Sequence, residues 1–201
     1  PKSFDCLLGP NDTSFIVKWA LLPLYRHTGS DLFRKRSGQA LDWLRKTIHA
    51  FGFAPSQYYS NEERWEDGAF VDTGFTPEGF HEYNETFAEN KNPAYTETVD
   101  FFMKRFVDRF RLPNGLYGSD YTPDAGVNSI IFSRGQGWVI EGLIAAFEET
   151  HDAWYKEGAI NLARLVVENQ NPDGSWPFYI GYGSPDDEVK RKTGICEKGT
   201  A

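Results

Sequence analysis

The sequence has few of the residues on which disulfide, metal or nucleophilic chemistry usually depends. Its 201 residues include two cysteines and four histidines. Cys6 and Cys196 do not form a CxxC pattern, so neither a disulfide framework nor a zinc site is indicated. No two histidines have the spacing of metal ligands, and none is placed as in a Ser-His triad. We therefore expect no metal and no other cofactor.

Basic runs and long apolar runs are also missing. The formal net charge is −8, and no cluster of Lys or Arg marks a surface for nucleic acid or an anionic membrane. No apolar stretch approaches the roughly 20 residues that a membrane-spanning helix needs. Nothing at the N-terminus reads as a signal peptide, so the compartment stays open between the cytoplasm and the periplasm or exterior. Neither nucleic acid nor a membrane is expected as a partner.

What the sequence does contain is a repeated helical hairpin. Apolar residues at helical spacing predict three pairs of helices, at about 12–51, 72–111 and 133–169. In each pair, two aromatic residues eight positions apart flank the turn: Tyr25 and Phe33, Phe87 and Tyr95, Phe147 and Tyr155. This common register indicates one unit that occurs three times along the chain.

Such hairpins predict a ring. A single hairpin cannot bury its apolar faces, whereas hairpins stacked side by side bury them and a closed ring leaves no exposed end. We therefore expect an all-α fold, the six-hairpin (α/α)6 toroid, of which three hairpins are about half. Loops rich in Gly, Pro and aromatic residues follow the second helices and are expected to form short β-turn structures. Residues 1–201 then form a single catalytic-type domain, a fragment of a longer ring; the alternative is an open helical solenoid.

Charged residues stand at the start of each first helix. Asp12 and Asp72 open the repeated phrase Asp-Thr-Ser/Gly-Phe, and Arg134 opens the third unit. An aspartate at this point is most often an N-cap. Equivalent positions in neighbouring repeats, beside aromatic loops, instead predict that the three side chains line one pocket. A general acid needs a raised pKa, and we expect Asp12 to be the neighbouring carboxylate that raises the pKa of Asp72.

Residues around Arg134 are suited to an acidic sugar. Its guanidinium can bind a carboxylate or sulfate through two hydrogen bonds, and the alternative is an ion pair with an acidic side chain of a loop. Trp138 lies one helical turn further on, where it can stack on a pyranose ring. Gln136, from the same segment, and Trp176, from the last aromatic loop, are further substrate-binding candidates.

These motifs resemble those of the six-hairpin glycosidases, and within them the unsaturated glucuronyl hydrolases of glycoside hydrolase family 88 and the related unsaturated rhamnogalacturonyl hydrolases of family 105. The segment Arg134-Gly135-Gln136-Gly137-Trp138 is similar to the family's Arg-Gly-Gln-Ala-Trp, whose Arg and Trp line the substrate pocket. Asn11-Asp12-Thr13-Ser14-Phe15 is similar to His-Asp-Leu-Gly-Phe, whose Asp is an active-site carboxylate. Asp72 falls where the second carboxylate, the general acid and base, begins the next inner helix.

The resemblance implies metal-free hydration of the C4=C5 bond of a terminal unsaturated uronic acid. Asp72 would protonate C4 and then activate water for attack at C5, while Asp12 would hold the substrate. Three positions differ from the family pattern. Asn11 stands in place of the His before the first Asp, Thr73 in place of the usual Asn, and Ser119 where the glucuronide hydrolases carry a His. Asn11 and Ser119 are kept as substrate-binding candidates.

Other functions remain open on the sequence. The two aspartates could serve as general acid and base in hydrolysis of a saturated glycoside. A carbohydrate-binding toroid without catalysis would keep the aromatic residues and Arg134 but would not need Asp72. A sugar epimerase on a similar ring would normally use histidines, and their positions here give it little support. The expected partner in each case is an oligosaccharide, with an acidic sugar for the hydrolase.

Overall fold

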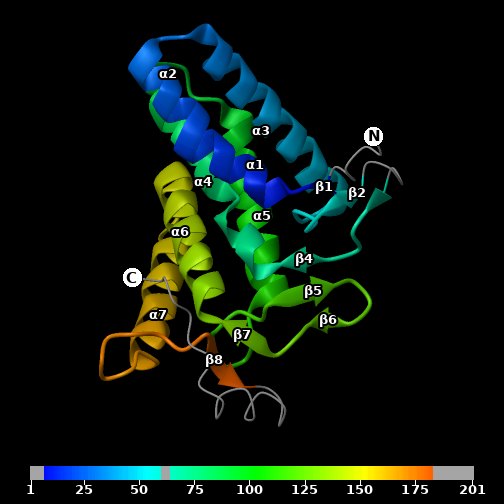
Figure 1. Ribbon diagram of the computed structural model, residues 1–201, viewed down its shortest axis with the longest axis vertical. Helices are drawn as coiled ribbons and strands as arrows, with labels where there is room; N and C mark the ends of the chain where they lie inside the picture. The colour runs from blue at the N-terminus through cyan, green and yellow to red at the C-terminus, as the bar shows by residue number, and fades with distance from the viewer. Residues whose placement is uncertain (1–6, 60–63, 183–201) are drawn as a thin grey trace, which may run out of the picture.

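The structure, a computed structural model, describes residues 7–59 and 64–182. Cys6 and Cys196 lie outside these residues. The described chain is mostly helical, with short strands gathered at one end of the helices (Figure 1). None of the described helices combines the length and the apolar character needed to cross a bilayer.

Three helical hairpins follow one another, as the sequence predicts. The first consists of a continuous run of α1 (Pro10–Ile16), the π-helical η1 (Val17–Leu21) and α2 (Leu22–Thr28), followed by α3 (Asp31–Phe51). The second consists of the 3₁₀ turn η2 (Val71–Phe75), α4 (Pro77–Thr86), the short η3 (Ala88–Asn90) and α5 (Pro93–Phe110). The third consists of α6 (Ser133–Thr150) and α7 (Ala153–Glu168). The first helices α1, α4 and α6 contact one another in that order and form the inner layer.

The π-helical segment was not predicted from the sequence. Periodicity alone suggests one regular helix up to about Tyr25, but Pro23 lies inside it. Proline has no backbone N–H to donate to the preceding turn, and its ring crowds the carbonyl four residues earlier. The wider turn at Val17–Leu21 ends two residues before this proline, and such a turn is a common way for a helix to absorb the disruption.

Local sequence signals account for the helix ends. Prolines occupy the first turns of α1, α4 and α5, where a missing N–H costs no hydrogen bond. Asn92 and Asp152 cap α5 and α7 by accepting a hydrogen bond from the backbone N–H two residues further on. Gly29 and Gly52 end α2 and α3 in the left-handed conformation, with φ of 65° and 70°.

The loops form three small antiparallel sheets that hold the starts of the inner helices. Their strand orders are β1 (Leu7–Leu8), β2 (Tyr58–Tyr59), β3 (Arg64–Trp65); β4 (Ala69–Phe70), β5 (Asp120–Thr122), β6 (Gly126–Val127); and β7 (Ile130–Phe132), β8 (Tyr179–Tyr182). Strand β4 runs directly into η2, and β7 runs directly into α6 (Figure 1). In the second sheet, Phe70 pairs with Asp120. The sheets therefore place loop side chains beside the first residues of the inner helices.

A repeated contact joins the outer helices. The side chain of Tyr95 on α5 donates its hydroxyl to Asp42 on α3, at 3.2 Å, and Tyr155 on α7 donates to Asp100 on α5, at 2.7 Å. Both rings are buried. Burial and the acceptor carboxylates raise the pKa of both phenols, so both remain donors. Each hairpin after the first thus makes the same contact with the outer helix before it.

The inner helices approach one another closely at small residues. Ser14 lies against Gly79 of α4, and its hydroxyl accepts the Gly79 N–H at 2.9 Å. Gly74 lies against Gly142 of α6, where an added Cβ would be 1.9 Å from the Gly74 carbonyl oxygen. Ser14 and Gly74 are the third residues of the two copies of the repeated phrase. The phrase therefore encodes the crossing point between neighbouring inner helices.

Charged pairs also connect the inner helices. They are Lys18 with Glu78, Arg26 with Glu82, His81 with Glu148 and Glu149, and Asp72 with Arg134. The side chain of Glu149 is 1% exposed, and it accepts further hydrogen bonds from Asn84 and Thr96. His81 therefore joins α4 to α6 through a nearly buried carboxylate.

The Gly74–Gly142 contact predicts a large effect of one methyl group. Gly142→Ala should lower the free energy of unfolding by about 2 kcal/mol or more, because the new Cβ meets backbone that cannot rotate away. Gly137→Ala on the same helix is the control: its Cβ meets nothing within 4 Å, and alanine favours a helix by up to about 1 kcal/mol. Urea unfolding followed by circular dichroism measures both. Equal stability of the two variants would contradict the crossing contact.

The His81 contacts predict a pH-dependent contribution to stability. Burial lowers the pKa of His81, but the hydrogen bond to Glu149 and the charges of Glu148, Glu149 and Glu78 outweigh it, so the pKa lies above its ordinary value. A raised histidine pKa stabilises the fold below the unfolded-state pKa, and this stabilisation is lost as pH rises through the folded-state pKa.

Thermal unfolding of wild type and His81→Gln across this range tests that prediction. The difference in Tm should be largest at mildly acidic pH and should shrink as pH rises. The control is His27→Gln, an exposed histidine on α2. A difference in Tm that stays constant with pH would show that the contribution of His81 to stability does not depend on its charge.

Candidate active site

A pocket of about 290 Å³ opens where α1 and η2 begin. Three segments far apart in sequence form its walls: the start of α1, the loop after α3, and the junction of β4 with η2. The lining residues are Gly9, Asn11, Asp12, Ser56, Gln57, Phe70, Asp72 and Thr73. We call this the aspartate pocket.

Asp12 and Asp72 both line the aspartate pocket, from neighbouring inner helices. Neither acts as a helix cap: the N-cap positions of α1 and η2 are Gly9 and Phe70, and neither helix has a side-chain capping bond. Asp12 is exposed, whereas the side chain of Asp72 is only 29% exposed. The two carboxylates therefore face the same space in different environments.

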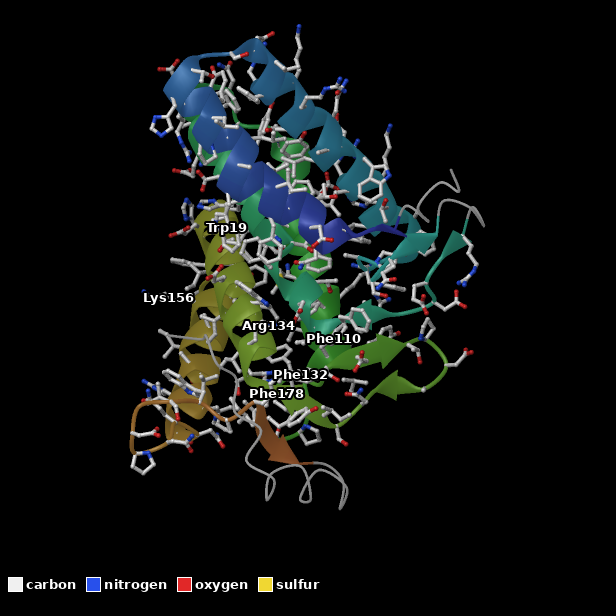
Figure 2. The ribbon with its side chains drawn as sticks, in the orientation of Figure 1. Trp19, Phe110, Phe132, Arg134, Lys156 and Phe178 are labelled. Atoms are coloured by element: carbon white, nitrogen blue, oxygen red, sulfur yellow. The ribbon has the colours of Figure 1, made fainter. Side chains whose placement is uncertain are left out.

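Asp72 is bonded to Arg134, with 3.1 Å between Oδ2 and a guanidinium nitrogen. Arg134 is the second residue of α6, close to the point where β7 leads into that helix (Figure 2). Burial raises the pKa of Asp72 above its ordinary value, the charge and hydrogen bond of Arg134 oppose that rise, and the charge of Asp120 adds to it. The ion pair expected as an alternative for Arg134 thus exists, but its partner is the candidate acid itself.

The structure corrects the sequence-based expectation of which carboxylate raises the pKa of Asp72. Asp120, not Asp12, supplies the charge that raises the pKa of Asp72. Asp120 looks like an ordinary loop acid in the sequence, but β5 pairs it with Phe70, two residues before Asp72. The Asn114-Gly115 turn predicts a short strand directly after it, where the structure has an isolated bridge between Arg111 and Tyr117. Strand β5, which carries Asp120, begins three residues after Tyr117.

Ser119 does not point to a ligand. The residue is 2% exposed, and its hydroxyl donates to Asp120 and bonds to Asn128 Oδ1. Asn128 also donates to the Asp120 carboxylate at 2.7 Å. The expected substrate-binding role of Ser119 is therefore replaced by a structural one, because these bonds hold Asp120 in place.

Gln136 is likewise turned inward. It is fully buried, its amide nitrogen donates to the Tyr117 carbonyl at 2.9 Å, and its amide oxygen accepts the Tyr117 N–H at 2.9 Å. These two bonds tie α6 to the loop after α5. The structure thus corrects the expectation that Gln136 contacts substrate: its position two residues after Arg134 puts it on a different face of the helix.

The remaining candidates lie on accessible walls. Asn11 lines the aspartate pocket, and its buried Oδ1 has no hydrogen-bond partner among the described residues. Trp138 and Trp176 line a second pocket, of about 400 Å³, together with Arg134. Asn11 therefore shares a pocket with the two aspartates, and both tryptophans line a separate pocket that Arg134 also lines.

The site can supply a proton and bind an anion. A raised pKa favours the neutral form of a carboxyl group, and the neutral form can donate a proton to a substrate atom. A guanidinium beside it can bind a substrate carboxylate. The described group best placed to hold a metal is His81, Glu85 and Glu149, with ligand atoms within 4.8 Å of one another, but it does not line the aspartate pocket.

No protein-family model and no curated protein matches the sequence. Solved structures do match the fold. An unsaturated glucuronyl hydrolase from Bacillus sp. GL1 has a TM-score of 0.71 at 14% identity, covering 88% of this chain and 50% of that one. A family 105 glycoside hydrolase from C. acetobutylicum has a TM-score of 0.64 at 17% identity, over 88% and 50%. A sugar epimerase from a ruminal bacterium has a TM-score of 0.68 at 11% identity, over 87% and 46%.

These likenesses confirm the predicted fold class, since identities of this size report on the fold alone. The chain spans about half the length of the solved structures that it matches. It therefore has the fold of the six-hairpin glycosidases, the all-α (α/α)6 toroid, of which it supplies three hairpins.

Proposed function

We propose that this chain is part of a glycoside hydrolase that removes a terminal unsaturated uronic acid from oligosaccharides by hydrating its C4=C5 bond. The observation that carries the proposal is Asp72, a half-buried carboxyl group with a raised pKa that is bonded to Arg134 in a pocket. Neighbours in fold include an unsaturated glucuronyl hydrolase described as specific for heparin. Because a fold can host several functions, the site and not the likeness has to carry the chemistry.

Asp72 supplies both proton transfers of the reaction. In its neutral form it donates its proton to C4, and positive charge develops on C5 and the ring oxygen. Water then adds to C5 and gives its proton to the Asp72 carboxylate, which restores the acid. The product bears a hydroxyl on C5 and opens to a ketone by breaking the bond from C5 to the ring oxygen. The hemiacetal left at C1 then collapses to an aldehyde and releases the next sugar.

Arg134 links the binding of the substrate to the pKa of Asp72. Its guanidinium is suited to the carboxylate on C5 of the substrate. In the free protein, Arg134 lowers the pKa of Asp72 by charge and by a hydrogen bond. A bound uronate neutralises that charge, so the pKa of Asp72 rises further when the substrate is in place. Substrate binding thereby favours the protonated form of Asp72, which is the form that donates to C4.

The other walls of the aspartate pocket hold the sugar. Asp12 is exposed to the pocket and can accept hydrogen bonds from ring hydroxyls. The unpartnered Oδ1 of Asn11 is a second acceptor. A ring held by these two residues on one side and by Arg134 on the other presents its C4=C5 edge to Asp72.

Histidine positions favour a hydrolase over a sugar epimerase. An epimerase on this ring would use histidines as acid and base, yet none is among the lining residues of the aspartate pocket. His49 bonds to Thr98 on an outer helix, and His81 bonds to Glu148 and Glu149. Carboxyl chemistry at Asp72 is what the described site provides.

Asp72→Asn tests the proton donor. We expect kcat on an unsaturated uronyl disaccharide to fall about a thousandfold, because an amide cannot protonate C4. The measurement is the loss of ultraviolet absorbance of the conjugated C4=C5 bond in the full-length protein. Asp124→Asn, at an exposed position between β5 and β6, is the control and should keep full activity. Unchanged turnover by Asp72→Asn, with wild-type stability, would leave a binding protein or a different acid as the explanation.

Arg134→Gln tests the coupling through the pH profile. We expect kcat/KM to fall about tenfold to a hundredfold, because the bidentate partner of the substrate carboxylate is lost. Activity requires protonated Asp72, so it falls as pH rises through the pKa of that group. Removing the positive charge raises this pKa, and the basic limb of the profile should move to higher pH. A basic limb that stays in place or moves to lower pH would contradict the role given to Arg134.

A further inference from the structure

A further pocket lies between the outer helices α5 and α7. Its volume is about 110 Å³, and no residue lines both this pocket and the aspartate pocket. Its side walls belong to two helices that the structure describes, and these helices are neighbours joined by the bond from Tyr155 to Asp100. The space is therefore not a flank left open for another hairpin. We call it the seam pocket.

The seam pocket has a buried apolar floor and an exposed polar rim. Leu143 and Tyr117, which belong to the floor, are 1% and 3% exposed. Arg111, Glu157 and Asn161 belong to the rim and are exposed. Among the residues that the structure describes, no hydrogen bond or ion pair engages these three side chains. Hydrogen-bond donors and acceptors therefore meet at this space without being used by the protein itself.

Trp154 adds an aromatic face to the same pocket. It is 43% exposed, and its ring makes an edge contact with the buried ring of Tyr155, with 5.0 Å between the ring centroids. Its indole N–H has no acceptor within the described part of the chain. An aromatic face beside a few polar groups is typical of sites that stack on the apolar face of a sugar ring.

Two side chains of α5 occupy the preceding seam, between α3 and α5. Thr98 bonds to His49 of α3 at 3.1 Å, and the ring of Phe101 lies 4.6 Å from the ring of His49. Thr98 and Phe101 stand three and six residues after Tyr95. Tyr155 is the equivalent of Tyr95 in the next repeat, because both tyrosines make the same contact with the outer helix before them.

The residues three and six positions after Tyr155 are Gly158 and Asn161, and both line the seam pocket. Packing does not require the glycine, because an added Cβ would lie 3.6 Å from Leu143, an ordinary contact distance. A glycine inside a helix is also less favourable than an alanine. The seam pocket is therefore not imposed by helix packing, and its open space is available to a ligand.

We propose that the seam pocket is a carbohydrate-binding site on the outer surface, which binds a neutral sugar ring and performs no chemistry. Trp154 stacks on the apolar face of the ring. Arg111 and Asn161 donate hydrogen bonds to its hydroxyl oxygens, and Glu157 accepts hydrogen bonds from its hydroxyls.

Charge and size define the ligand. The charged lining residues are Arg111 and Glu157, whose charges cancel, so the pocket exerts no net attraction on a uronic acid. A volume of about 110 Å³ has room for several water-sized groups, so one edge of a sugar ring enters it and the rest lies against Trp154 outside. This site goes beyond the proposed hydration and does not depend on it.

Fluorine NMR of the full-length protein, labelled with fluorinated tryptophan, tests the site directly. The signal of Trp154 is identified by its loss in Trp154→Phe. The neutral probes are the methyl glycosides of glucose, galactose, mannose and rhamnose, and methyl glucuronide is the acidic probe. At least one neutral probe should shift the Trp154 signal to saturation and bind at least about tenfold more tightly than methyl glucuronide. If no neutral probe gives a saturable shift of that signal, the proposal is wrong.

Two variants test the assigned residues. Asn161→Phe gives α7 the residue that α5 has in the preceding seam, and it should weaken the binding of the neutral probe at least about tenfold by filling the pocket. Arg111→Gln should weaken binding about threefold to tenfold, because hydrogen bonds from a charged donor are lost. Arg164→Gln, at an exposed position of α7 that does not line the pocket, is the matched control and should keep wild-type affinity. Wild-type affinity in both Asn161→Phe and Arg111→Gln would overturn the site.

The seam pocket and the hydration chemistry can fail separately. Asp72→Asn should leave the affinity measured at Trp154 unchanged, and Asn161→Phe should leave kcat on an unsaturated disaccharide unchanged. A Trp154 shift that disappears in Asp72→Asn would mean that the probe binds in the aspartate pocket, and it would overturn the outer site. A Trp154 shift that persists in a protein without hydrating activity would support the outer site and contradict the hydration alone.

Discussion

The close crossing of neighbouring inner helices is the contact on which the rest of the structure depends. Ser14 against Gly79 and Gly74 against Gly142 leave no room for a larger side chain at either crossing. Because the helices meet there, the residues on either side of each crossing are brought into register across the inner layer. One consequence is that Phe15, Phe75 and Trp138 form a single aromatic cluster. Another is that Asp72 meets Arg134 from the next unit.

At the candidate site, burial and the charge of Arg134 shift the pKa of Asp72 in opposite directions. Burial favours the neutral form of Asp72, while Arg134 favours the ionised form. A group held between two such influences responds strongly to any change in either of them. In the proposed reaction, a substrate carboxylate that engages Arg134 would weaken one of these two influences and favour the neutral form of Asp72. Arg134 would then act on proton transfer as well as on binding.

Much of the fold could be predicted from the sequence because helix periodicity and repeat register are local signals. The repeated phrase contains both the pocket aspartates, Asp12 and Asp72, and the residues at the helix crossings, Ser14 and Gly74. The repeat therefore indicates both a site and a packing contact. The site was predicted less completely. Tertiary contacts decide where the Gln136 side chain points and which carboxylate approaches Asp72. Short strands such as β4 and β5 have too few residues for the sequence to specify their partners.

The tyrosine contacts of the outer layer have a direction along the chain. Tyr95 reaches back from α5 to α3, and Tyr155 reaches back from α7 to α5, so each acceptor belongs to the hairpin before it. Protein synthesis proceeds from the N-terminus, and units fold as they emerge. Each of these two hairpins therefore has its acceptor on a helix that is synthesised earlier. The direction of the contacts is compatible with hairpins that dock in the order of synthesis.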